Sequence, residues 1–237
     1  MANLIIDIGN TALKAAWTDG MTLGKTFRYQ GEKMMDFILS LTSKARPEVM
    51  VLSSVRHFSS ANIALLRNEC ERLLIVCDEV LAHYGLPSYL TPDRAASIVA
   101  ARYLFNGKGC TIFDFGTTLS VDFLDSEGNY EGGLISPGCK TRFKSLHRYS
   151  KSLPLLDAPG SVAEMGNDMP SSIAYGVVAG MMFEIEGQIC RHRTNVNVFT
   201  GGDAIYFAKQ MKNSIFVVCN LVLMGLALMA VEYDCKD

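Results

Sequence analysis

The 237-residue chain lacks the features that mark several classes of protein. It has no run of Lys or Arg and a formal net charge of −2, so nothing indicates a nucleic-acid partner. Its seven cysteines are scattered and never spaced as Cys-x-x-Cys, which argues against a disulfide framework or a zinc site and for reduced thiols. The four histidines also lack metal-ligand spacing. No basic segment precedes an apolar one near the N-terminus, as an export signal requires, so we expect a cytoplasmic protein.

The chain has one long apolar run, over residues 215–231. This run is slightly short for a membrane span and is interrupted by Asn220, so a membrane helix is the less favoured alternative. We expect instead a β-branched strand over 215–218, a turn near Asn220 and a buried helix that continues to about Tyr233. No membrane partner is therefore expected.

The remaining sequence is that of a globular α/β protein. Hydrophobic residues make up 49% of the chain and charged residues 19%, and strand patterns alternate with amphipathic helix patterns. Expected strands are a hairpin over 3–18, 23–29, 48–54, 73–77, a second hairpin over 110–124, 130–136, 196–199 and 215–218. Expected helices are 32–44, 58–71, 91–105, 140–150, 171–192, a helix after Asp203, and 221–233. The stretch 151–170 is expected to be a long irregular loop, a kind of loop that is often functional.

One supersecondary pattern occurs twice, over residues 4–17 and 111–124. In each copy an apolar strand runs into Asp-x-Gly-x-Thr and is followed by a second strand. The repeat predicts two related halves that face one another across a cleft. Because no flexible linker is visible, we expect the halves to join directly, as a first domain over 1–108 and a second over 109–237.

The chemistry of this hairpin suits a nucleotide phosphate. Glycine lacks a Cβ and allows a tight turn, so backbone N–H groups can approach a phosphate closely. The Thr hydroxyl adds a donor, and the Asp at the strand end can hold Mg²⁺. A single copy is better explained as an ordinary turn, but two copies favour a phosphate clamp. The residues concerned are Asp7, Gly9, Asn10 and Thr11 in the first copy and Asp114, Gly116, Thr117 and Thr118 in the second.

Charged residues outside the turns have two readings each. Lys14 follows the first hairpin and either reaches a phosphate or faces solvent. Thr91, Pro92 and Asp93 form a strong helix start, in which Asp93 could simply stabilise the positive end of the helix dipole. Arg94 offers a planar fork for a carboxylate or amide oxygen, or is a solvated surface charge.

Five motifs in order resemble those of the type III pantothenate kinases, members of the superfamily of acetate and sugar kinases, heat-shock ATPases and actin. The resemblance covers essentially the whole chain. It rests on Asp7-Ile-Gly-Asn-Thr-Ala-Leu-Lys14, Asp114-Phe-Gly-Thr-Thr118, Gly132-Gly-Leu-Ile-Ser-Pro-Gly138, Leu153-Pro154 and Thr200-Gly-Gly-Asp203.

The resemblance implies two ribonuclease-H-like domains that enclose a nucleotide cleft, and ATP-dependent phosphorylation of pantothenate to 4′-phosphopantothenate, the first step of coenzyme A biosynthesis. It implies Asp93 as the general base, Mg²⁺ near Asp7, and a monovalent cation, K⁺ or NH₄⁺, at Asp114. It also implies a homodimer with a shared active site. The ATP- and phosphate-binding residues would be Asp7, Gly9, Asn10, Thr11, Lys14, Gly116 and Thr117. The pantothenate-binding residues would be Tyr84, Thr91, Pro92, Asp93, Arg94 and Met169, although Tyr84 could equally be a core residue.

Two motifs depart from the family pattern. The family has Gly-x-Asp-Arg at the substrate helix, where this chain has Thr91-Pro-Asp-Arg94, and it has Thr after Gly-Lys-Asn, where this chain has Gly166-Asn-Asp-Met169. The substrate contacts would therefore use a different set of hydrogen bonds. Two alternatives stay open: a small-molecule kinase of other specificity on the same fold, and a nucleotide-binding accessory or regulatory relative without full catalytic activity.

Overall fold

The structure, a computed structural model, describes residues 2–160 and 164–234. Its contacts divide the chain into two compact units. The first unit contains the chain up to Leu104 together with the chain from Asn220, and the second contains Phe105–Cys219. The expected division into 1–108 and 109–237 is therefore wrong for the end of the chain, because the last helix packs into the first unit.

The first unit is built on a five-stranded sheet of order β3-β2-β1-β4-β5. The first three strands form antiparallel pairs, and β4 and β5 continue the sheet parallel to β1. The strands are β1 (Ala2–Ile8), β2 (Leu13–Asp19), β3 (Thr22–Tyr29), β4 (Val49–Ser54) and β5 (Arg72–Ile75).

The second unit repeats this topology in a sheet of order β8-β7-β6-β9-β10. Again the first three strands are antiparallel and the last two run parallel to the central strand. The strands are β6 (Cys110–Phe115), β7 (Thr118–Leu124), β8 (Tyr130–Pro137), β9 (Val196–Gly201) and β10 (Phe216–Val217). The prediction of two related α/β halves, each opened by a hairpin, is confirmed.

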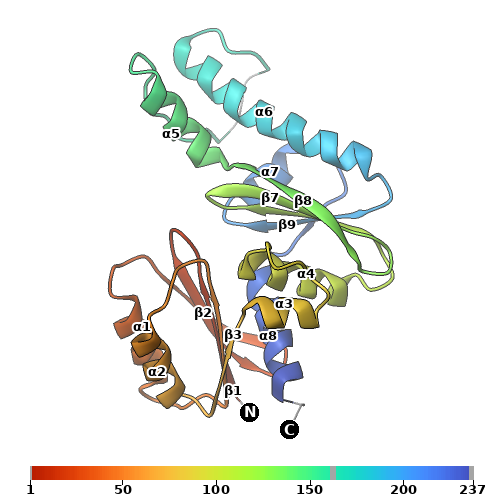
Figure 1. Ribbon diagram of the computed structural model, residues 1–237. Coiled ribbons are helices and arrows are strands. Elements are labelled where there is room, and N and C mark those ends of the chain that lie inside the picture. The colour runs from red at the N-terminus through yellow and green to blue at the C-terminus, as the bar shows by residue number, and fades with distance from the viewer. Residues whose placement is uncertain (1, 161–163, 235–237) are drawn as a thin grey trace. The chain divides into compact units, whose positions relative to one another are not determined.

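Helices cover both faces of the first sheet (Figure 1). On one face, α1 (Met34–Thr42) and α2 (Ser60–Asn68) cover the even-numbered side chains of β1. These side chains, Leu4, Ile6 and Ile8, lie in the core on that face. On the other face, α4 (Pro92–Leu104) and α8 (Leu221–Asp234) pack together and against β4 and β1. Because side chains alternate along a strand, Asp7 lies on the face that α4 and α8 cover.

Helix α8 is buried in the first unit. Its buried residues lie all around the helix, as its uniform apolar sequence requires. Gly225 allows it to touch α4, since a Cβ there would lie 1.8 Å from the carbonyl oxygen of Ala96. The strand and helix expected within the apolar run 215–231 are both present, as β10 and α8.

One helix in the described residues has the length and composition of a membrane span, and it is α6 (Met169–Arg191). Only 39% of the most apolar 18-residue stretch of this helix is buried in the structure, and Phe183 is 62% exposed.

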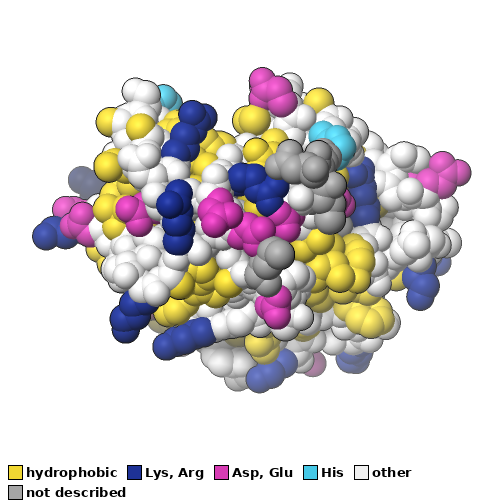
Figure 2. Space-filling model, turned by 90° about the horizontal axis from the view of Figure 1, so that it is seen from below, with side chains coloured by type: hydrophobic (Ala, Val, Ile, Leu, Met, Phe, Trp, Pro, Cys, Tyr) yellow, Lys and Arg dark blue, Asp and Glu magenta, His cyan; other side chains and the backbone are white. Residues whose placement is uncertain are grey.

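Charged side chains of both signs are mixed on the face of the molecule that Figure 2 shows. Lys and Arg lie among Asp and Glu there and do not form one basic surface.

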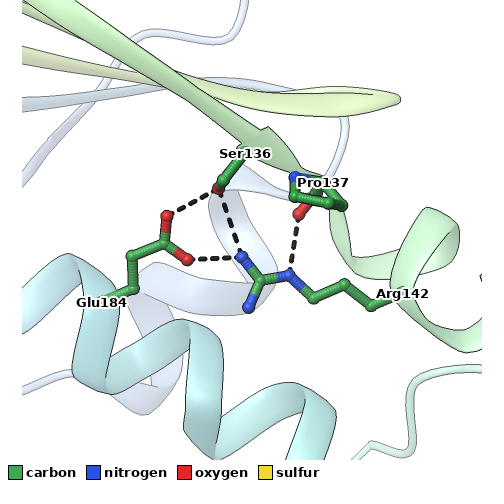
Figure 3. A network of polar contacts seen from close by, with 4 residues as sticks. All are labelled: Ser136, Pro137, Arg142 and Glu184. Carbon is green, nitrogen blue, oxygen red and sulfur yellow. Dashed lines mark hydrogen bonds and ion pairs between the residues drawn. The ribbon is translucent and has the colours of Figure 1, made fainter.

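In the second unit a polar network ties β8 to α5 (Cys139–Tyr149) and α6 (Figure 3). Arg142 forms an ion pair with Glu184, and its Nε donates to the carbonyl of Pro137 at 2.8 Å. The hydroxyl of Ser136 donates to Glu184 Oε1 at 2.6 Å and accepts from Arg142 Nη2 at 3.2 Å. These contacts fix the end of β8 and thus the turn at Gly138 that follows it.

The helix prediction missed one short helix and differs from the structure by up to three residues at the bounds of others. The short helix α3 (Asp78–His83) was not expected, because six residues carry too little periodicity to be recognised. Helix α6 begins at Met169 rather than Ser171, because Asp168 caps it: Asp168 Oδ1 accepts from the Ser171 N–H at 2.7 Å. The remaining helix is α7 (Ala204–Gln210), after the Gly-Gly-Asp segment as expected.

Candidate active site

The first hairpin places Asp7 at the carboxyl end of the central strand β1. Lys14 lies directly opposite Asp7 on β2, and Ser53 lies beside it on β4. Residues paired in this way project from the same face of a sheet, so the carboxylate stands between an ammonium and a hydroxyl. Asp7 is 7% exposed, and its Oδ1 accepts a hydrogen bond from Ser53 Oγ at 3.0 Å. A buried, hydrogen-bonded carboxylate at a strand end is well fixed to hold a metal–phosphate complex.

The glycines of the two hairpins are not required by the fold. Neither Gly9 nor Gly116 has a positive φ. A Cβ at Gly9 would lie 3.5 Å from the Ala12 carbonyl, and one at Gly116 would lie 3.6 Å from the Thr118 carbonyl, both ordinary contacts. Neither turn therefore requires glycine for its own backbone geometry. What remains is the other reason, that a missing side chain lets a ligand approach the backbone closely.

The second hairpin is held by backbone from two other segments. The carbonyl of Thr117 accepts from the Gly138 N–H at 3.0 Å and from Thr141 Oγ1 at 2.6 Å. Gly201 has φ +91°, and a Cβ there would lie 2.4 Å from Asp114 Oδ1. Thr200 is the strand neighbour of Asp114, as Ser53 is of Asp7. The two Asp residues thus occupy equivalent positions in the two units.

Asp203 adds a second carboxyl group to this hairpin. Its backbone N–H contacts the carbonyl of Phe115 at 3.4 Å. Burial raises the pKa of its carboxyl group, and the positive charge of Lys140 partly opposes that shift. Nearby, burial together with the charge of Asp203 raises the pKa of the Cys139 thiol to about 11, so this cysteine stays protonated at neutral pH.

The start of α4 carries Asp93 and Arg94. The Ala95 N–H donates to the Thr91 carbonyl at 3.0 Å, which makes Thr91 the residue that precedes the helix and Pro92 its first residue, as predicted. Asp93 is half-buried, and its Oδ1 accepts from the Arg94 N–H at 3.0 Å. Arg94 is only 7% exposed, so it is not a solvated surface charge.

Tyr84 is held away from this helix start. Its hydroxyl donates to Glu232 Oε2 at 2.6 Å, and its carbonyl accepts from Arg102 Nη1 at 2.7 Å. Burial and the Glu232 carboxylate both raise the pKa of Tyr84. Arg102 is in the last turn of α4 and Asp93 in the first, about 13 Å apart along the helix axis. The contacts that fix Tyr84 therefore lie at the opposite end of α4 from Asp93.

The departure at Gly166-Asn-Asp-Met169 has a local structural role. The segment forms the start of α6, in which Asp168 and Ser171 cap one another reciprocally. These hydrogen bonds lower the pKa of Asp168. Gly166 packs against Ser172, where a Cβ would lie 2.3 Å from the Cα atom. Met169 is the first helical residue and is 53% exposed.

Sequence comparison with known families matches this arrangement to one of them. The family model for type III pantothenate kinase matches residues 3–191, which include both hairpins and the start of α4. The chain belongs to the type III pantothenate kinase family. It is 37% identical to the type III pantothenate kinase of Phocaeicola vulgatus and 36% identical to that of Bacteroides fragilis. These alignments cover 94% of this chain and 96% and 95% of the relatives.

Several solved structures share the fold of this chain. A Baf family protein from Campylobacter jejuni has a TM-score of 0.67 at 19% identity, over 99% of this chain and all of that chain. The activator of 2-hydroxyisocaproyl-CoA dehydratase from Clostridium difficile, with bound ADPNP, scores 0.61 at 14% identity and covers 100% of this chain and 96% of that one. The ROK hexokinase of Thermus thermophilus scores 0.58 at 12% identity over the whole of both chains. The chain thus has the same fold as these three proteins.

The structure brings some of the expected site residues together within the first unit. Asp7, Lys14 and α4 with its Asp93–Arg94 pair share one face of the first sheet. Sequence analysis missed Ser53, although the polar Ser53-Ser54 pair after four apolar residues of β4 was a usable signal. In residues 2–160 and 164–234, no three His, Cys, Asp or Glu side chains cluster as a metal site.

Proposed function

We propose that the chain transfers the γ-phosphoryl group of ATP to the hydroxyl of pantothenate, giving 4′-phosphopantothenate and ADP in the first step of coenzyme A biosynthesis. Membership of the type III pantothenate kinase family supports the reaction. The observation that carries it is the placement of α4, whose first turn bears Asp93 and Arg94, on the sheet face where Asp7 and Lys14 stand. The Asp93–Arg94 pair and the first hairpin then lie on the same face of the sheet in the first unit.

The two hairpins are proposed to hold the triphosphate. Backbone N–H groups beside Gly9 and Gly116, with the Thr11 and Thr117 hydroxyls, would donate to phosphate oxygens. Lys14 lies across from Asp7 and would offset part of the phosphate charge, and Asp7 would hold a Mg²⁺ ion that supplies further positive charge to the phosphates. This arrangement requires the hairpins of the two units to face one another across the nucleotide.

Asp93 is proposed as the general base. The pantothenate oxygen attacks the γ-phosphorus, a new O–P bond forms, and the bond from that phosphorus to the β,γ-bridging oxygen breaks as ADP leaves. The hydroxyl proton passes to Asp93, whose Oδ1 is held by the Arg94 N–H. A loose phosphoryl-transfer transition state requires little basicity, so an ordinary carboxylate suffices if it is well positioned. Arg94, Thr91, Pro92 and Met169 would orient pantothenate.

A monovalent cation, K⁺ or NH₄⁺, is proposed at Asp114. Two backbone carbonyls belong to this hairpin: the Phe115 carbonyl lies, like Asp114 Oδ1, beside the position that a Cβ of Gly201 would occupy, and the Thr117 carbonyl lies at the hairpin turn. An irregular set of carboxylate and carbonyl oxygens fits K⁺ better than a second octahedral Mg²⁺. The cation would supply a positive charge beside the phosphates.

We further propose a homodimer in which the partner completes the pantothenate pocket. The apolar surface of α8 is buried within the first unit and is not available to a partner. Helix α6, by contrast, exposes the apolar side chains of Phe183 and Met169, which a partner copy could cover. A cavity of about 750 Å³ between α5 and α6, with a mostly apolar lining that includes Leu146, Ile173 and Val177, adjoins this surface. An active monomer in analytical sedimentation would refute the dimer.

The test of the function is a coupled assay of ADP release with ATP and pantothenate, with and without K⁺. The expected result is turnover that depends on pantothenate, with a product whose mass equals that of phosphopantothenate. Nucleotide binding without turnover on pantothenate would favour the accessory or regulatory alternative. Turnover with other alcohols and none with pantothenate would favour a kinase of other specificity.

A further inference from the structure

The segment Ser53–Arg56, which follows β4, runs alongside the first phosphate hairpin. The Val55 N–H donates to the Ile8 carbonyl at 3.1 Å, which extends the β1–β4 pairing beyond the strand end. One residue later, Arg56 Nη2 donates to the carbonyl of Asn10 at 2.5 Å, at the turn itself. The guanidinium of Arg56 is therefore attached to the tip of the hairpin.

Two further contacts fix the position of Arg56. Ser54 Oγ accepts from the Arg56 N–H at 3.0 Å and donates to the Arg56 carbonyl at 2.9 Å, so the backbone is closed into a local turn. The other terminal nitrogen, Nη1, contacts the sulfur of Met34 in α1 at 3.6 Å. The side chain is thus held at both terminal nitrogens, whereas a solvated surface arginine samples many rotamers.

The charge of this guanidinium is not neutralised by the protein. Within the described part of the chain, no Asp or Glu forms an ion pair with Arg56, and both of its side-chain contacts are with neutral acceptors. A guanidinium has five N–H donors in a fixed fork, so donors remain for another acceptor. Planar forks of this kind bind phosphate oxygens in pairs.

We propose that Arg56 is a further phosphate-contacting residue, which binds the terminal phosphates of the nucleotide at the first hairpin. The carbonyl of Asn10 holds the guanidinium beside the backbone groups that bind phosphate. Its charge then offsets the negative charge that the transferred group presents in the transition state. This inference rests on the proposed use of ATP, but it makes no use of pantothenate.

The test compares Arg56→Gln and Arg56→Lys with the matched control Arg67→Gln, which removes an exposed arginine from α2 in the same unit. The ligand is the Mg²⁺ complex of an ATP analogue with a β,γ-imido bridge. A charged hydrogen bond is worth about 1.5–3 kcal/mol, so Arg56→Gln should bind this complex roughly 10- to 100-fold more weakly than the parent. Arg56→Lys keeps the charge and is expected to fall between the parent and Arg56→Gln. The control should bind as the parent does.

Two measurements separate phosphate contact from a merely structural role. Isothermal titration calorimetry with AMP should show little change in Arg56→Gln, because AMP lacks the terminal phosphates. The fall in affinity for the imido analogue with rising salt should be shallower in Arg56→Gln than in the parent, because one charge contact is missing. An equal loss for AMP and the analogue, or an unchanged affinity for both, would overturn the proposal. If the parent binds the analogue but never phosphorylates pantothenate, the proposed function fails while the Arg56 result still decides this inference.

Discussion

Replacing Gly225 with Ala tests whether the contact between α8 and α4 positions the candidate base. A Cβ at this position would lie 1.8 Å from the Ala96 oxygen, 2.5 Å from its carbonyl carbon and 2.9 Å from its Cα. All three atoms belong to the backbone of α4, so no side-chain rotation can relieve the clash. The contact must lengthen by about 1.2 Å, from 1.8 to 3.0 Å, before it becomes tolerable.

The cost of this substitution follows from that displacement. Overpacking of a core costs about 1–3 kcal/mol where side chains can move, and a clash between two backbones belongs at the upper end of that range. Ala96 follows Asp93 within the first turns of α4, so a shift of the helix also moves the base. A misplacement of about 1 Å can lower the rate about 100-fold. We therefore expect Gly225→Ala to lower the free energy of unfolding by about 2–3 kcal/mol and kcat by at least tenfold.

The assay is equilibrium unfolding in urea, paired with kinetics at a temperature where both proteins are folded. The matched control is Gly187→Ala, an exposed glycine of α6 whose added Cβ meets nothing within 4 Å. Ala in a free helical position should stabilise the protein by about 0.5–1 kcal/mol. If Gly225→Ala is as stable as the parent, the close packing of α4 on α8 is refuted. Full activity in a destabilised variant would refute only the link to Asp93.

Substitutions at three other residues test the proposed chemistry. Asp93→Asn should leave nucleotide binding intact and lower kcat in steady-state kinetics about 100-fold or more. Near-normal turnover would show that Asp93 only stabilises the start of the helix. At matched ionic strength and saturating Mg²⁺, the parent should be more active in K⁺ or NH₄⁺ than in Na⁺, and this preference should disappear in Asp114→Asn. Equal rates of the parent in all three salts would contradict a cation site at Asp114. Ser53→Ala should raise the Mg²⁺ concentration for half-maximal rate about tenfold, because Asp7 loses a hydrogen bond of 3.0 Å, while Ser53→Thr should restore it. An unchanged Mg²⁺ requirement in Ser53→Ala would contradict the role of this bond.

Local patterns predicted most of the fold. The two Asp-x-Gly-x-Thr hairpins identified the central strand of each sheet, and the helix signals at Thr91 and Pro92 placed the start of α4 correctly. The position of α8 was not predictable in the same way. A helix that is apolar on all sides must be buried, but its sequence does not say in which core.

The candidate site was predictable in its residue types and less so in its geometry. Asp7 and Lys14 are neighbours within one hairpin, so their pairing follows from the chain itself. Ser53 and Arg56 reach the same hairpin only through the parallel pairing of β4 with β1. Parallel strands are joined by a long crossover, and no local pattern in the sequence specifies their register.

The sequence by itself determined the repeated hairpin, the family and the order of strands and helices, because each of these can be recognised from patterns of residues close together in the chain. The tertiary structure decided which core receives the last helix, which hydroxyl holds Asp7, and that Tyr84 is fixed at the far end of α4. Around the second hairpin it also showed that a Cβ would lie closer than 3.0 Å to the protein at Gly138 and Gly201, whereas at Gly9 and Gly116 a Cβ would make only ordinary contacts. The physical reason is the same in each case: contacts between segments distant in the chain depend on shape and register, which form only when the whole unit has folded.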